Sequence, residues 1–326
     1  MNTCFIGGTG RSGTSILKKI ISQHSQAISI PIESRFAVDP DGIFDFYRSY
    51  STGWSPYYAD QKIKRLFSLL ENLGASSSHH RIFYYLLKVC GYFGVSITSK
   101  QYHNIQLNNY IPNYSTIINE LKNNLIEFQY YGARLGSPSY KLKNKLIYAN
   151  PYSKDDLKNL FREFFQNILD DLNQGQNKDL YVDDNTWNIL FASDIIDLMP
   201  SPKIISVIRD PRDVVSSLSR QKWMPIEKEN TAKIYNGLIS QWIKIRHSLK
   251  SDFWFEIKLE DLVKNPRDQL INICEFINVP FEENLLKIDL SKANIGRWES
   301  DFTANEKDRV LPLLEKNINL LGYEYR

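Results

Sequence analysis

The sequence of 326 residues holds only three cysteines. Cys4, Cys90 and Cys274 lie far apart, are odd in number, and each stands in an apolar run. A disulfide framework or a zinc site would need cysteines in pairs or at close, regular spacing. We therefore expect three reduced, buried thiols and no metal site.

Long apolar runs are also missing. The longest, residues 82–95, is interrupted by Lys88 and is shorter than the roughly 20 residues that a membrane-spanning helix needs. A strand-like segment follows Met1 at once, with neither the basic leader nor the cleavage site of a secretory signal. The sequence therefore predicts a cytoplasmic protein that has no membrane as a partner.

A strong excess of one charge is absent as well. Lys and Arg number 40 and Asp and Glu 37, which gives a net charge of +3 at pH 7, and the basic residues are scattered along the chain. Because nucleic-acid binders concentrate basic residues on one face, we expect no nucleic-acid partner. The charge distribution does not exclude small ligands that carry phosphate. With 42% hydrophobic and 13% aromatic residues, the composition is typical of a folded protein and excludes a disordered or fibrous chain.

The two ends of the chain carry alternating strand and helix patterns around a long middle. Short apolar runs predict strands at residues 3–8, 27–30, 204–208 and 253–258, and apolar spacing predicts helices at 12–23, from Asp210, and along 234–249. Residues 38–178 are rich in Asn, Tyr and Phe, with helices expected near 60–73, 81–93, 114–130 and 153–173 and no clear strands between them. Because strands that alternate with helices form parallel sheets, we expect an α/β fold in which residues 38–178 are a mostly helical insertion or lid.

The first chemical signal is the run G-G-T-G-R-S-G-T-S at residues 7–15, between the first strand and the first helix. Glycines let the backbone turn tightly around an anion, and the helix N-terminus adds free N–H donors and a positive dipole end. The run therefore predicts a phosphate-binding loop, with a plain glycine turn as the alternative. Its spacing resembles a Walker A loop, but Thr14 stands where nucleotide-hydrolysing loops need Lys, and Arg11 is the loop's only cation. Turnover of ATP or GTP is therefore disfavoured.

The second signal is the run R-D-P-R-D-V-V-S-S at residues 209–217. An expected strand ends at Arg209, and the next helix carries Ser217 about two turns later, at the edge where open α/β sheets bind ligands. A guanidinium and a hydroxyl suit a second phosphate. Taken alone, Arg209 and Arg212 could equally form salt bridges at the helix end, but together with the first loop they favour a phosphate site.

In order and spacing, these segments resemble the sulfotransferases that use 3′-phosphoadenosine 5′-phosphosulfate (PAPS). The first loop is similar to that family's 5′-phosphosulfate loop, and Arg209 with Ser217 is similar to its 3′-phosphate motif. The run K-A-N-I-G-R-W-E-S-D-F-T at residues 292–303 resembles the family's loop that closes over the cofactor, and L-E-D-L-V-K-N-P at residues 259–266 resembles the segment before it. The four segments lie at both ends of the chain, and the middle does not align.

The resemblance implies a P-loop-type three-layer α/β/α fold, formed as one sulfotransferase domain over residues 1–326. It implies transfer of a sulfuryl group from PAPS to a hydroxyl or an amine, without metal. The residues that it assigns to PAPS binding are Gly10, Arg11, Ser12, Gly13, Thr14 and Ser15 for the 5′-phosphosulfate, Arg209 and Ser217 for the 3′-phosphate, and Lys292 or Arg297 from the late loop. Arg11 would also stabilise charge on the leaving oxygen, which makes it a catalytic candidate.

The acceptor's proton needs a base within hydrogen-bond reach. The cytosolic small-molecule branch of the family uses a histidine, and none of the five histidines lies in a segment that matches that motif. The run I-E-S-R-F at residues 32–36 instead resembles the E-[ST]-R segment of the tyrosylprotein and bacterial branches, in which the Glu is the base. Glu33 is therefore the expected base, and a surface Glu paired with Arg35 is the alternative.

The chain departs from the family pattern at the segment of residues 181–188. Many relatives carry a Lys there that approaches the bridging oxygen, whereas this chain has Asp184 or Asn185 at that place, which leaves Arg11 as the catalytic cation. Asp183 and Asp184 are expected to cap the helix that follows, with a metal site as the alternative.

A second departure concerns the adenine ring. Ile16 and Leu259 replace aromatic residues that face adenine in some branches, so that another residue must cover the ring. Trp223 or Trp298 suits this role, and core packing is the alternative for each.

The sequence thus predicts a PAPS-dependent sulfotransferase, with a P-loop nucleotide or small-molecule kinase and a non-catalytic nucleotide-binding module as alternatives. The expected acceptor is a small metabolite, with a carbohydrate or a peptidyl tyrosine next in order. The Tyr, Phe and Asn residues of 38–178 suit an aromatic-lined pocket with polar contacts, although core packing explains most of them equally well. The oligomeric state stays open.

Overall fold

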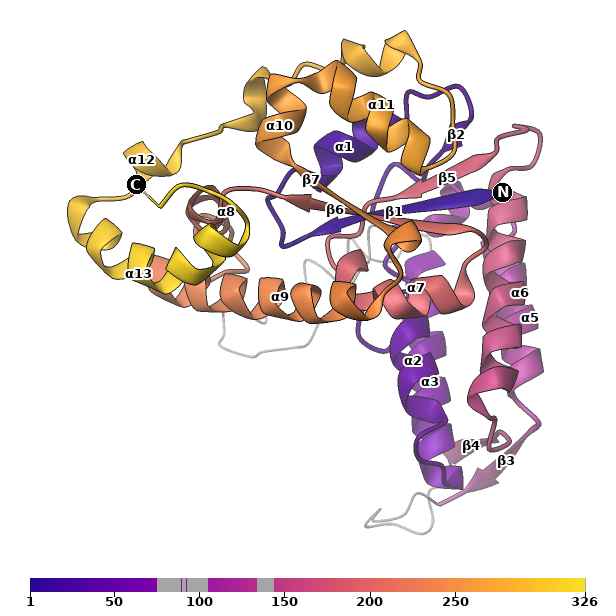
Figure 1. Ribbon diagram of the computed structural model, residues 1–326. Helices are drawn as coiled ribbons and strands as arrows, with labels where there is room; N and C mark the ends of the chain where they lie inside the picture. Colours follow the sequence, from indigo (N-terminus) through magenta and orange to yellow (C-terminus); the bar gives the residue numbers. More distant parts are fainter. Residues whose placement is uncertain (75–88, 90–91, 93–104, 134–143, 326) are drawn as a thin grey trace. The chain divides into compact units, whose positions relative to one another are not determined.

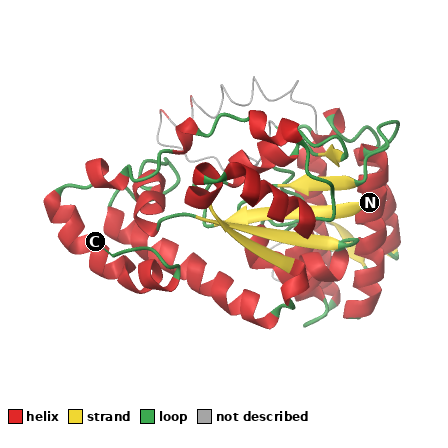
Figure 2. Ribbon diagram, turned by 45° about the horizontal axis from the view of Figure 1, so that its top comes forward, coloured by secondary structure: helices red, strands yellow, loops and turns green. Residues whose placement is uncertain are grey.

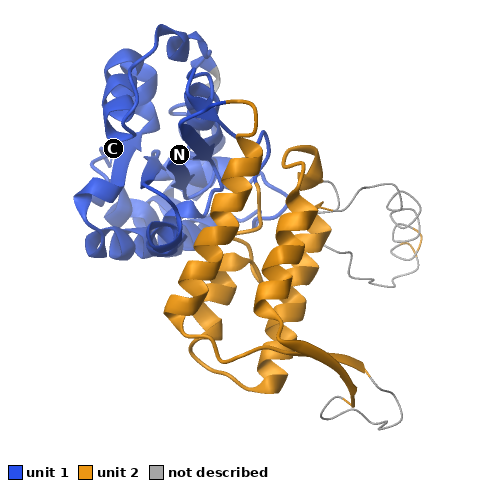
Figure 3. Ribbon diagram, turned by 90° about the vertical axis from the view of Figure 1, so that its right-hand side faces the viewer, with its two compact units in different colours: residues 1–33, 177–326 blue, residues 34–176 orange. Residues whose placement is uncertain are grey.

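The computed structural model describes residues 1–74, 89, 92, 105–133 and 144–325 (Figure 1). The chain divides into two compact units, one of residues 1–33 and 177–326 and the other of residues 34–176 (Figure 3). Apart from two positions, the helix expected near 81–93 falls outside the described residues, and so does Cys90. The single domain expected over the whole chain stays a prediction.

The first unit is built on a five-stranded sheet in which every neighbouring pair of strands is parallel. The strands are β1 (Asn2–Gly8), β2 (Ala27–Ile28), β5 (Leu180–Asp183), β6 (Pro202–Ile208) and β7 (Trp254–Lys258), in the order β2-β5-β1-β6-β7. β1 lies at the centre, where Phe5 is in register with Asp183 on one side and Ile204 on the other. Because the carboxyl ends of parallel strands share one edge, β1, β5 and β6 deliver the residues that follow them to the same place.

Helices cover both faces of this sheet, as Figures 1 and 2 show. One face carries α1 (Thr14–Ile21), α10 (Leu259–Lys264) and α11 (Pro266–Phe276). The other carries α7 (Ala192–Leu198), α8 (Pro211–Leu218) and α9 (Lys228–Ser248), and α13 (Ala304–Leu320) packs against α8 and α9. The strands are apolar on both faces, as a sheet between two helical layers requires. The three-layer α/β/α prediction is confirmed.

The core under α1 explains why this helix packs where it does. Ile20 and Ile21 lie three and four positions after Leu17, so that the three share one face, and all are at most 2% exposed. They meet β-strand residues such as Cys4 and residues of α11 such as Cys274. Both cysteines are buried free thiols, as expected. Burial, and to a lesser extent the charge of Asp183, holds the pKa of the Cys4 thiol well above its usual value.

The second unit is mostly helical (Figure 3). Its elements are α2 (Ile43–Tyr50), α3 (Pro56–Gly74), η2 (Leu107–Asn109), α5 (Tyr114–Leu125) and α6 (Lys154–Leu172), with an antiparallel pair of strands, β3 (Phe128–Gly132) and β4 (Asn144–Tyr148). Aromatic side chains fill its interior, including the stacked rings of Phe46 and Tyr50 with centroids 4.6 Å apart. Nine of the aromatic residues within 38–178 are buried in this core, whereas others, such as Phe128 and Tyr131, are exposed.

Two sequence expectations for this region were wrong: the extent of the helix near 114–130 and the lack of strands between the helices. The helix expected at 114–130 ends at Leu125, and its last residues belong to β3. The run Phe-Gln-Tyr-Tyr favours a strand, and its partner β4 lies beyond residue 143, too far along the chain for local periodicity to reveal.

The remaining short elements of the first unit lie at strand ends and in the late part of the chain. They are η3 (Asn188–Phe191), η4 (Ser251–Phe253), η5 (Glu283–Lys287), η6 (Ser291–Ala293) and α12 (Trp298–Asp301). Within the described part of the chain, no helix combines the length and the apolar character that crossing a membrane requires.

Candidate functional site

The glycine-rich loop joins β1 to α1 with an unusual backbone. Gly10, Arg11 and Gly13 have positive φ angles of 84°, 56° and 107°. Left-handed conformations in such a turn point successive N–H groups toward one concave side, which forms an anion-binding nest. For Arg11 the conformation is also strained, since a residue with a Cβ adopts it only at a cost. The backbone of the loop therefore has the shape of an anion-binding nest.

The loop is packed so tightly that only glycine fits at two of its positions. A Cβ on Gly8 would collide with the Ser12 hydroxyl, and one on Gly13 would lie 2.8 Å from a methyl group of Leu259. Ser12 is fully buried, and its Oγ has no hydrogen-bond partner among the described residues. The loop thus keeps a buried hydroxyl with unused hydrogen-bonding capacity at the N-terminus of α1.

The N-terminus of α1 adds backbone donors to this loop. Gly13 is its N-cap residue and has no capping side chain, so that the first N–H groups of the helix stay open toward the loop. Thr14 is buried in the first turn, and Ser15 beside it is exposed. Free N–H groups at the positive end of a helix dipole favour a bound anion.

The second motif lies directly against this loop. The Nε–H of Arg11 donates to the Ser217 hydroxyl at 3.0 Å, and Nη1 of Arg209 donates to the Arg11 carbonyl oxygen at 3.1 Å. Some 200 positions of sequence separate the two segments, which meet because β1 and β6 are neighbours in the sheet. The structure therefore brings together three of the expected phosphate ligands.

Arg209 and Arg212 have different surroundings. Arg212 forms a bidentate ion pair with Asp210, the N-cap residue of α8, and its guanidinium lies 4.3 Å from the centre of the Trp298 ring. Arg212 therefore forms the salt bridge at the helix end that the sequence allowed as an alternative to phosphate binding. Arg209 is 7% exposed, lies 3.5 Å from Asp213, and keeps a buried Nε without a hydrogen-bond partner among the described residues. Arg209 is therefore the better anion ligand.

The late loop is attached to the same motif. Nη2 of Arg209 donates to the Asn294 carbonyl oxygen, and the Asp213 carboxylate accepts the N–H groups of Gly296 and Trp298 at 2.7 and 2.9 Å. A carboxylate that accepts two backbone bonds fixes the path of a loop firmly. Residues 294–298 are thereby held beside Arg209.

The two cations expected from the late loop are Lys292 and Arg297, and no contact of Arg297 with Arg209 or the glycine-rich loop is found among the described interactions. Lys292 belongs to η6, and its side chain lies outside the described part of the structure. Arg297 is exposed, with its Nε 3.3 Å from Asp301. Burial alone would raise the pKa of Asp301, but hydrogen bonds from Ser216 and Arg220, with the charges of Arg220 and Arg297, hold that pKa below its usual value.

Glu33 lies on the same edge of the sheet, five positions after the end of β2. Its side chain is half-buried, which provides part of the desolvation that a general base needs. The preceding carbonyl, that of Ile32, accepts a hydrogen bond from Nζ of Lys18 at 3.4 Å. Lys18 also forms a buried ion pair with Asp184, with 2.6 Å between Nζ and Oδ1.

Lys18 is a residue that the sequence analysis missed. The available signal was a lysine on the apolar side of α1, one turn after Thr14, where a buried charge demands a partner. The partner, Asp184, is 166 positions away in sequence, and no local pattern connects the two.

The expectation that Asp183 and Asp184 cap the next helix was wrong. The element that follows, η3, begins at Asn188 after an N-cap residue that has no capping side chain. Asp183 instead accepts the N–H of Asn185 and the side-chain amide of Asn188, at 3.1 and 2.8 Å. Asp184 pairs with Lys18, so that each carboxylate has a protein partner of its own.

The two tryptophans considered for the adenine ring differ in exposure. Trp298 is 7% exposed and packs edge-on against Phe302, so that it belongs to the core. Trp223 is 59% exposed, and its ring edge lies 3.9 Å from where a Cβ on Gly10 would stand. An exposed aromatic ring at the mouth of the loop is available to a ligand, whereas Trp298 is not.

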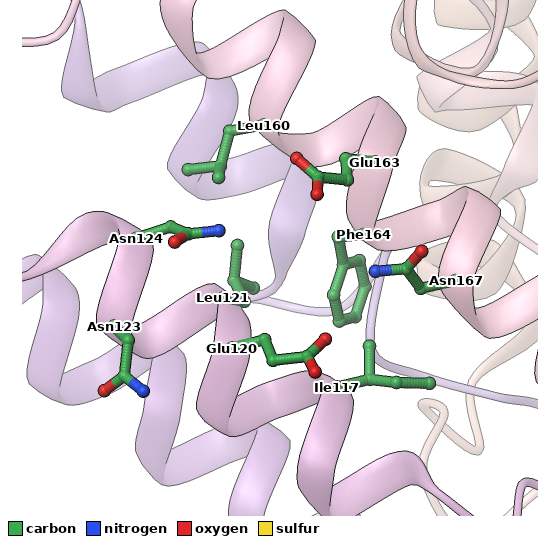
Figure 4. A pocket seen from close by; sticks show the side chains of 9 residues that line it. All are labelled: Ile117, Glu120, Leu121, Asn123, Asn124, Leu160, Glu163, Phe164 and Asn167. Atoms are coloured by element: carbon green, nitrogen blue, oxygen red, sulfur yellow. The ribbon is translucent and has the colours of Figure 1, made fainter.

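A separate hollow of about 220 Å³ lies in the second unit between α5 and α6 (Figure 4). Its polar lining consists of two carboxylates and three amides, from Glu120, Asn123, Asn124, Glu163 and Asn167. Since none of its described lining residues is a cation, this hollow does not suit a phosphate-bearing ligand.

Comparison with known proteins gives a family match that includes Arg209 and Ser217 but not the glycine-rich loop. The model of the family described as "Sulfotransferase family" matches residues 118–283, just over half of the chain. A Caenorhabditis elegans protein named "Putative protein-tyrosine sulfotransferase" is 25% identical over 130 residues, which are 37% of this chain and 48% of that protein. The match thus spans about half of that relative's length.

Two solved structures resemble the whole chain at low sequence identity. A sulfotransferase domain from the curacin biosynthetic pathway is 14% identical, with a TM-score of 0.48 over 99% of this chain and 98% of its own. A sulfotransferase domain from the Synechococcus PCC 7002 olefin synthase is 15% identical, with a TM-score of 0.47 over 97% of this chain and 94% of its own.

Proposed function

The chain belongs to the sulfotransferase family, and on that premise we propose that it transfers a sulfuryl group from PAPS to a hydroxyl or an amine of an acceptor. One observation carries the proposal: the bond of 3.0 Å from Arg11 to Ser217 joins the glycine-rich loop to the second anion motif. Two anion sites that share a hydrogen bond suit one ligand that carries two separate anionic groups. PAPS is such a ligand, with its 5′-phosphosulfate and its 3′-phosphate.

The residues of the site fit such a ligand. The loop is a nest of left-handed residues, and two buried polar atoms in it and beside it, Ser12 Oγ and Arg209 Nε, have no hydrogen-bond partner among the described residues. Buried polar atoms normally have a partner, and a bound anion would supply one for each of these two atoms. When bound, PAPS supplies the activated sulfuryl group.

The loop and the start of α1 hold the 5′-phosphosulfate in this proposal. The backbone N–H groups of residues 12–15 donate to it, and the hydroxyls of Thr14 and Ser15 add further bonds. Arg11 is exposed, so that its guanidinium is accessible from solvent, and it stabilises negative charge on the leaving oxygen. Gly10 and Gly13 provide the turn that no other residue tolerates as well.

The second motif holds the 3′-phosphate. Arg209 and Ser217 donate to it in this proposal, and Lys292 or Arg297 of the late loop is the further cation that it assigns to PAPS. A binding site for the 3′-phosphate distinguishes PAPS from ATP, which lacks that group. Thr14, in place of the Walker A lysine, further disfavours ATP.

Glu33 is the proposed base. It accepts the proton of the acceptor's hydroxyl or amine as that group attacks sulfur in line with the leaving oxygen. The products are the sulfated acceptor and adenosine 3′,5′-bisphosphate (PAP). A sulfuryl group carries less negative charge than a phosphoryl group, and backbone N–H groups with Arg11 suffice for it without a metal ion.

The acceptor in this proposal is a small metabolite, with a carbohydrate or a peptidyl tyrosine as the next candidates. The name of the C. elegans relative, which matches over part of its length, favours testing a tyrosine peptide. Residues 38–178 would shape the acceptor site. The cytoplasmic location expected from the sequence stays a prediction.

Thermal unfolding with two ligands tests the proposed donor. PAP is expected to raise the melting temperature, because a ligand that binds only the folded state stabilises it. ATP with magnesium is expected to have a much smaller effect. A larger shift with ATP and magnesium would favour a P-loop kinase and reject the proposal. Binding of PAP without turnover of PAPS, on a panel of phenols, sugars and a tyrosine peptide read by mass spectrometry, would favour a non-catalytic module.

A further inference from the structure

The Lys18–Asp184 pair is a buried ion pair close to the loop, and the proposed chemistry does not use it. The two side chains are 9% and 6% exposed, and 2.6 Å separates Nζ from Oδ1. The free energy needed to remove both charges from water is about as large as the free energy gained from their attraction. A buried ion pair therefore contributes little to the stability of the fold. A role in arranging the site explains its position better.

The pair joins three segments of the first unit at the carboxyl edge of the sheet. Lys18 stands on α1, one turn behind the glycine-rich loop, and Asp184 directly follows β5. The third segment follows β2, where the Ile32 carbonyl accepts from Nζ of Lys18 at 3.4 Å. One ammonium group therefore contacts the helix of the donor site, the neighbouring strand end and the peptide unit that precedes Glu33.

The ladder between β2 and β5 does not reach Glu33. Pairing of β2 with β5 is recorded only at Ala27 and Ile28, so that the ladder ends well before Glu33. A base must stand within about 3 Å of the proton it accepts, and a displacement of about 1 Å costs on the order of 10²-fold in rate. The Ile32 carbonyl is the neighbouring peptide group, so that its bond to Lys18 limits where the Glu33 carboxylate can go.

We infer that the Lys18–Asp184 pair positions Glu33 for proton abstraction by tying residues 30–33 to the helix that carries the donor loop. This inference rests on the proposed function and deepens it. Lys18 and Asp184 are positioning residues, since their contacts are with the protein at Ile32 and with each other. Asp184 fixes the direction of the lysine side chain, and Lys18 in turn fixes the backbone.

Four variants test the role of the pair. Lys18→Met leaves Asp184 buried without its partner, Asp184→Asn weakens the hold on Lys18, and Lys18→Arg keeps the charge. The double variant Lys18→Met with Asp184→Leu removes both charges, so that no unpaired charge stays buried and the fold is preserved. Lys228→Met is the matched control, since it breaks another partly buried pair of this unit, with Glu306 at 2.5 Å.

Hydrogen exchange read by mass spectrometry gives the first measurement, with PAP as the ligand. In Lys18→Met and in the double variant, the peptide that covers residues 29–36 is expected to exchange about 10-fold faster or more, because a lost tether lets the segment open. The peptide that covers residues 9–15 is expected to keep its protection by PAP. Unchanged exchange at residues 29–36 in the double variant would overturn the inference, whatever the activity.

Steady-state kinetics with PAPS give the second measurement, on the acceptor that the wild type sulfates best in a panel of 4-nitrophenol, glucosamine and a tyrosine peptide. The double variant is expected to lose about 10- to 100-fold in kcat while KM for PAPS changes less than about 3-fold. Lys18→Arg is expected to recover most of the rate, and Lys228→Met to behave like the wild type.

The outcomes separate the two proposals. An active wild type with an unchanged kcat in the double variant rejects the positioning role and leaves the sulfotransferase proposal intact. A wild type that neither binds PAP nor consumes PAPS rejects the proposed function, and faster exchange at residues 29–36 would then support only the tether itself.

Discussion

The guanidinium of Arg209 donates to the backbone carbonyl oxygen of Arg11 at 3.1 Å. Through this bond the second anion motif supports Arg11 of the glycine-rich loop in its strained conformation, with a φ of 56°. The same arginine reaches the late loop at Asn294, so that one side chain connects three segments that the sequence separates widely. We expect the conformation of the donor loop and the binding of the 3′-phosphate to depend on each other for this reason.

The first prediction concerns Arg209. Arg209→Ala is expected to weaken PAP binding about 10- to 100-fold, because hydrogen bonds to a charged group are each worth about 1.5–3 kcal/mol. Isothermal titration with PAP and with adenosine 5′-phosphate, which lacks the 3′-phosphate, gives the decisive comparison. The preference for PAP should shrink in the variant. Arg267→Ala, at an exposed ion pair with Glu283, is the control. An undiminished preference in Arg209→Ala would remove this residue from the 3′-phosphate site.

The second prediction concerns Gly13. Gly13→Ala is expected to destabilise the protein by about 2 kcal/mol or more, since the left-handed conformation alone costs about 1–2 kcal/mol and the new methyl group also meets Leu259. It should also abolish measurable PAP binding. Gly237→Ala is a matched control inside α9, where nothing lies within 4 Å of the added Cβ and alanine favours the helix by about 1 kcal/mol. Urea unfolding measures both variants, and equal stabilities would contradict the loop geometry.

The third prediction concerns Glu33. Glu33→Gln should lower turnover about 10²-fold or more, because the amide cannot accept the acceptor's proton, while the affinity for PAP stays nearly the same. Glu283→Gln, on an exposed glutamate, serves as the control. The turnover rate is measured with PAPS and the affinity by titration with PAP, for both variants and the wild type. Full activity in Glu33→Gln would show that another group is the base.

The fourth prediction follows from the lowered pKa of Asp301. A carboxylate whose pKa is lower in the folded than in the unfolded state stabilises the fold above its unfolded pKa of 3.8 and loses that contribution as the pH falls further. Asp301→Asn is therefore expected to cost about 1 kcal/mol at pH 7 and much less near pH 3. Urea unfolding of both proteins at the two pH values measures this difference. A cost that grows as the pH falls would contradict the assigned ion pairs with Arg220 and Arg297.

The two turns of the proposed donor site were predictable because each is a local pattern. A strand, a glycine-rich turn and a helix follow one another within residues 2–21, and the second motif repeats that order at residues 202–218. Parallel strands then bring the two turns to one edge. The parallel sheet with helices on both faces follows from the same alternation and is confirmed.

Other parts could not be read from the sequence, since they depend on contacts between distant residues. Nothing near Lys18 indicates Asp184 as its partner, and nothing near Phe128 indicates that its strand pairs beyond residue 143. The bond from Asp213 to the late loop spans more than 80 positions. Periodicity detects which residues are buried, but it does not identify what a buried charge is paired with.

A crystal structure of the chain with PAP tests the central claim most directly. The account predicts the 5′-phosphate against the backbone N–H groups of residues 12–15 and the 3′-phosphate within hydrogen-bond distance of Arg209 and Ser217. A complex in which the 3′-phosphate is bound elsewhere, with Arg209 still bonded only to the protein, would contradict it.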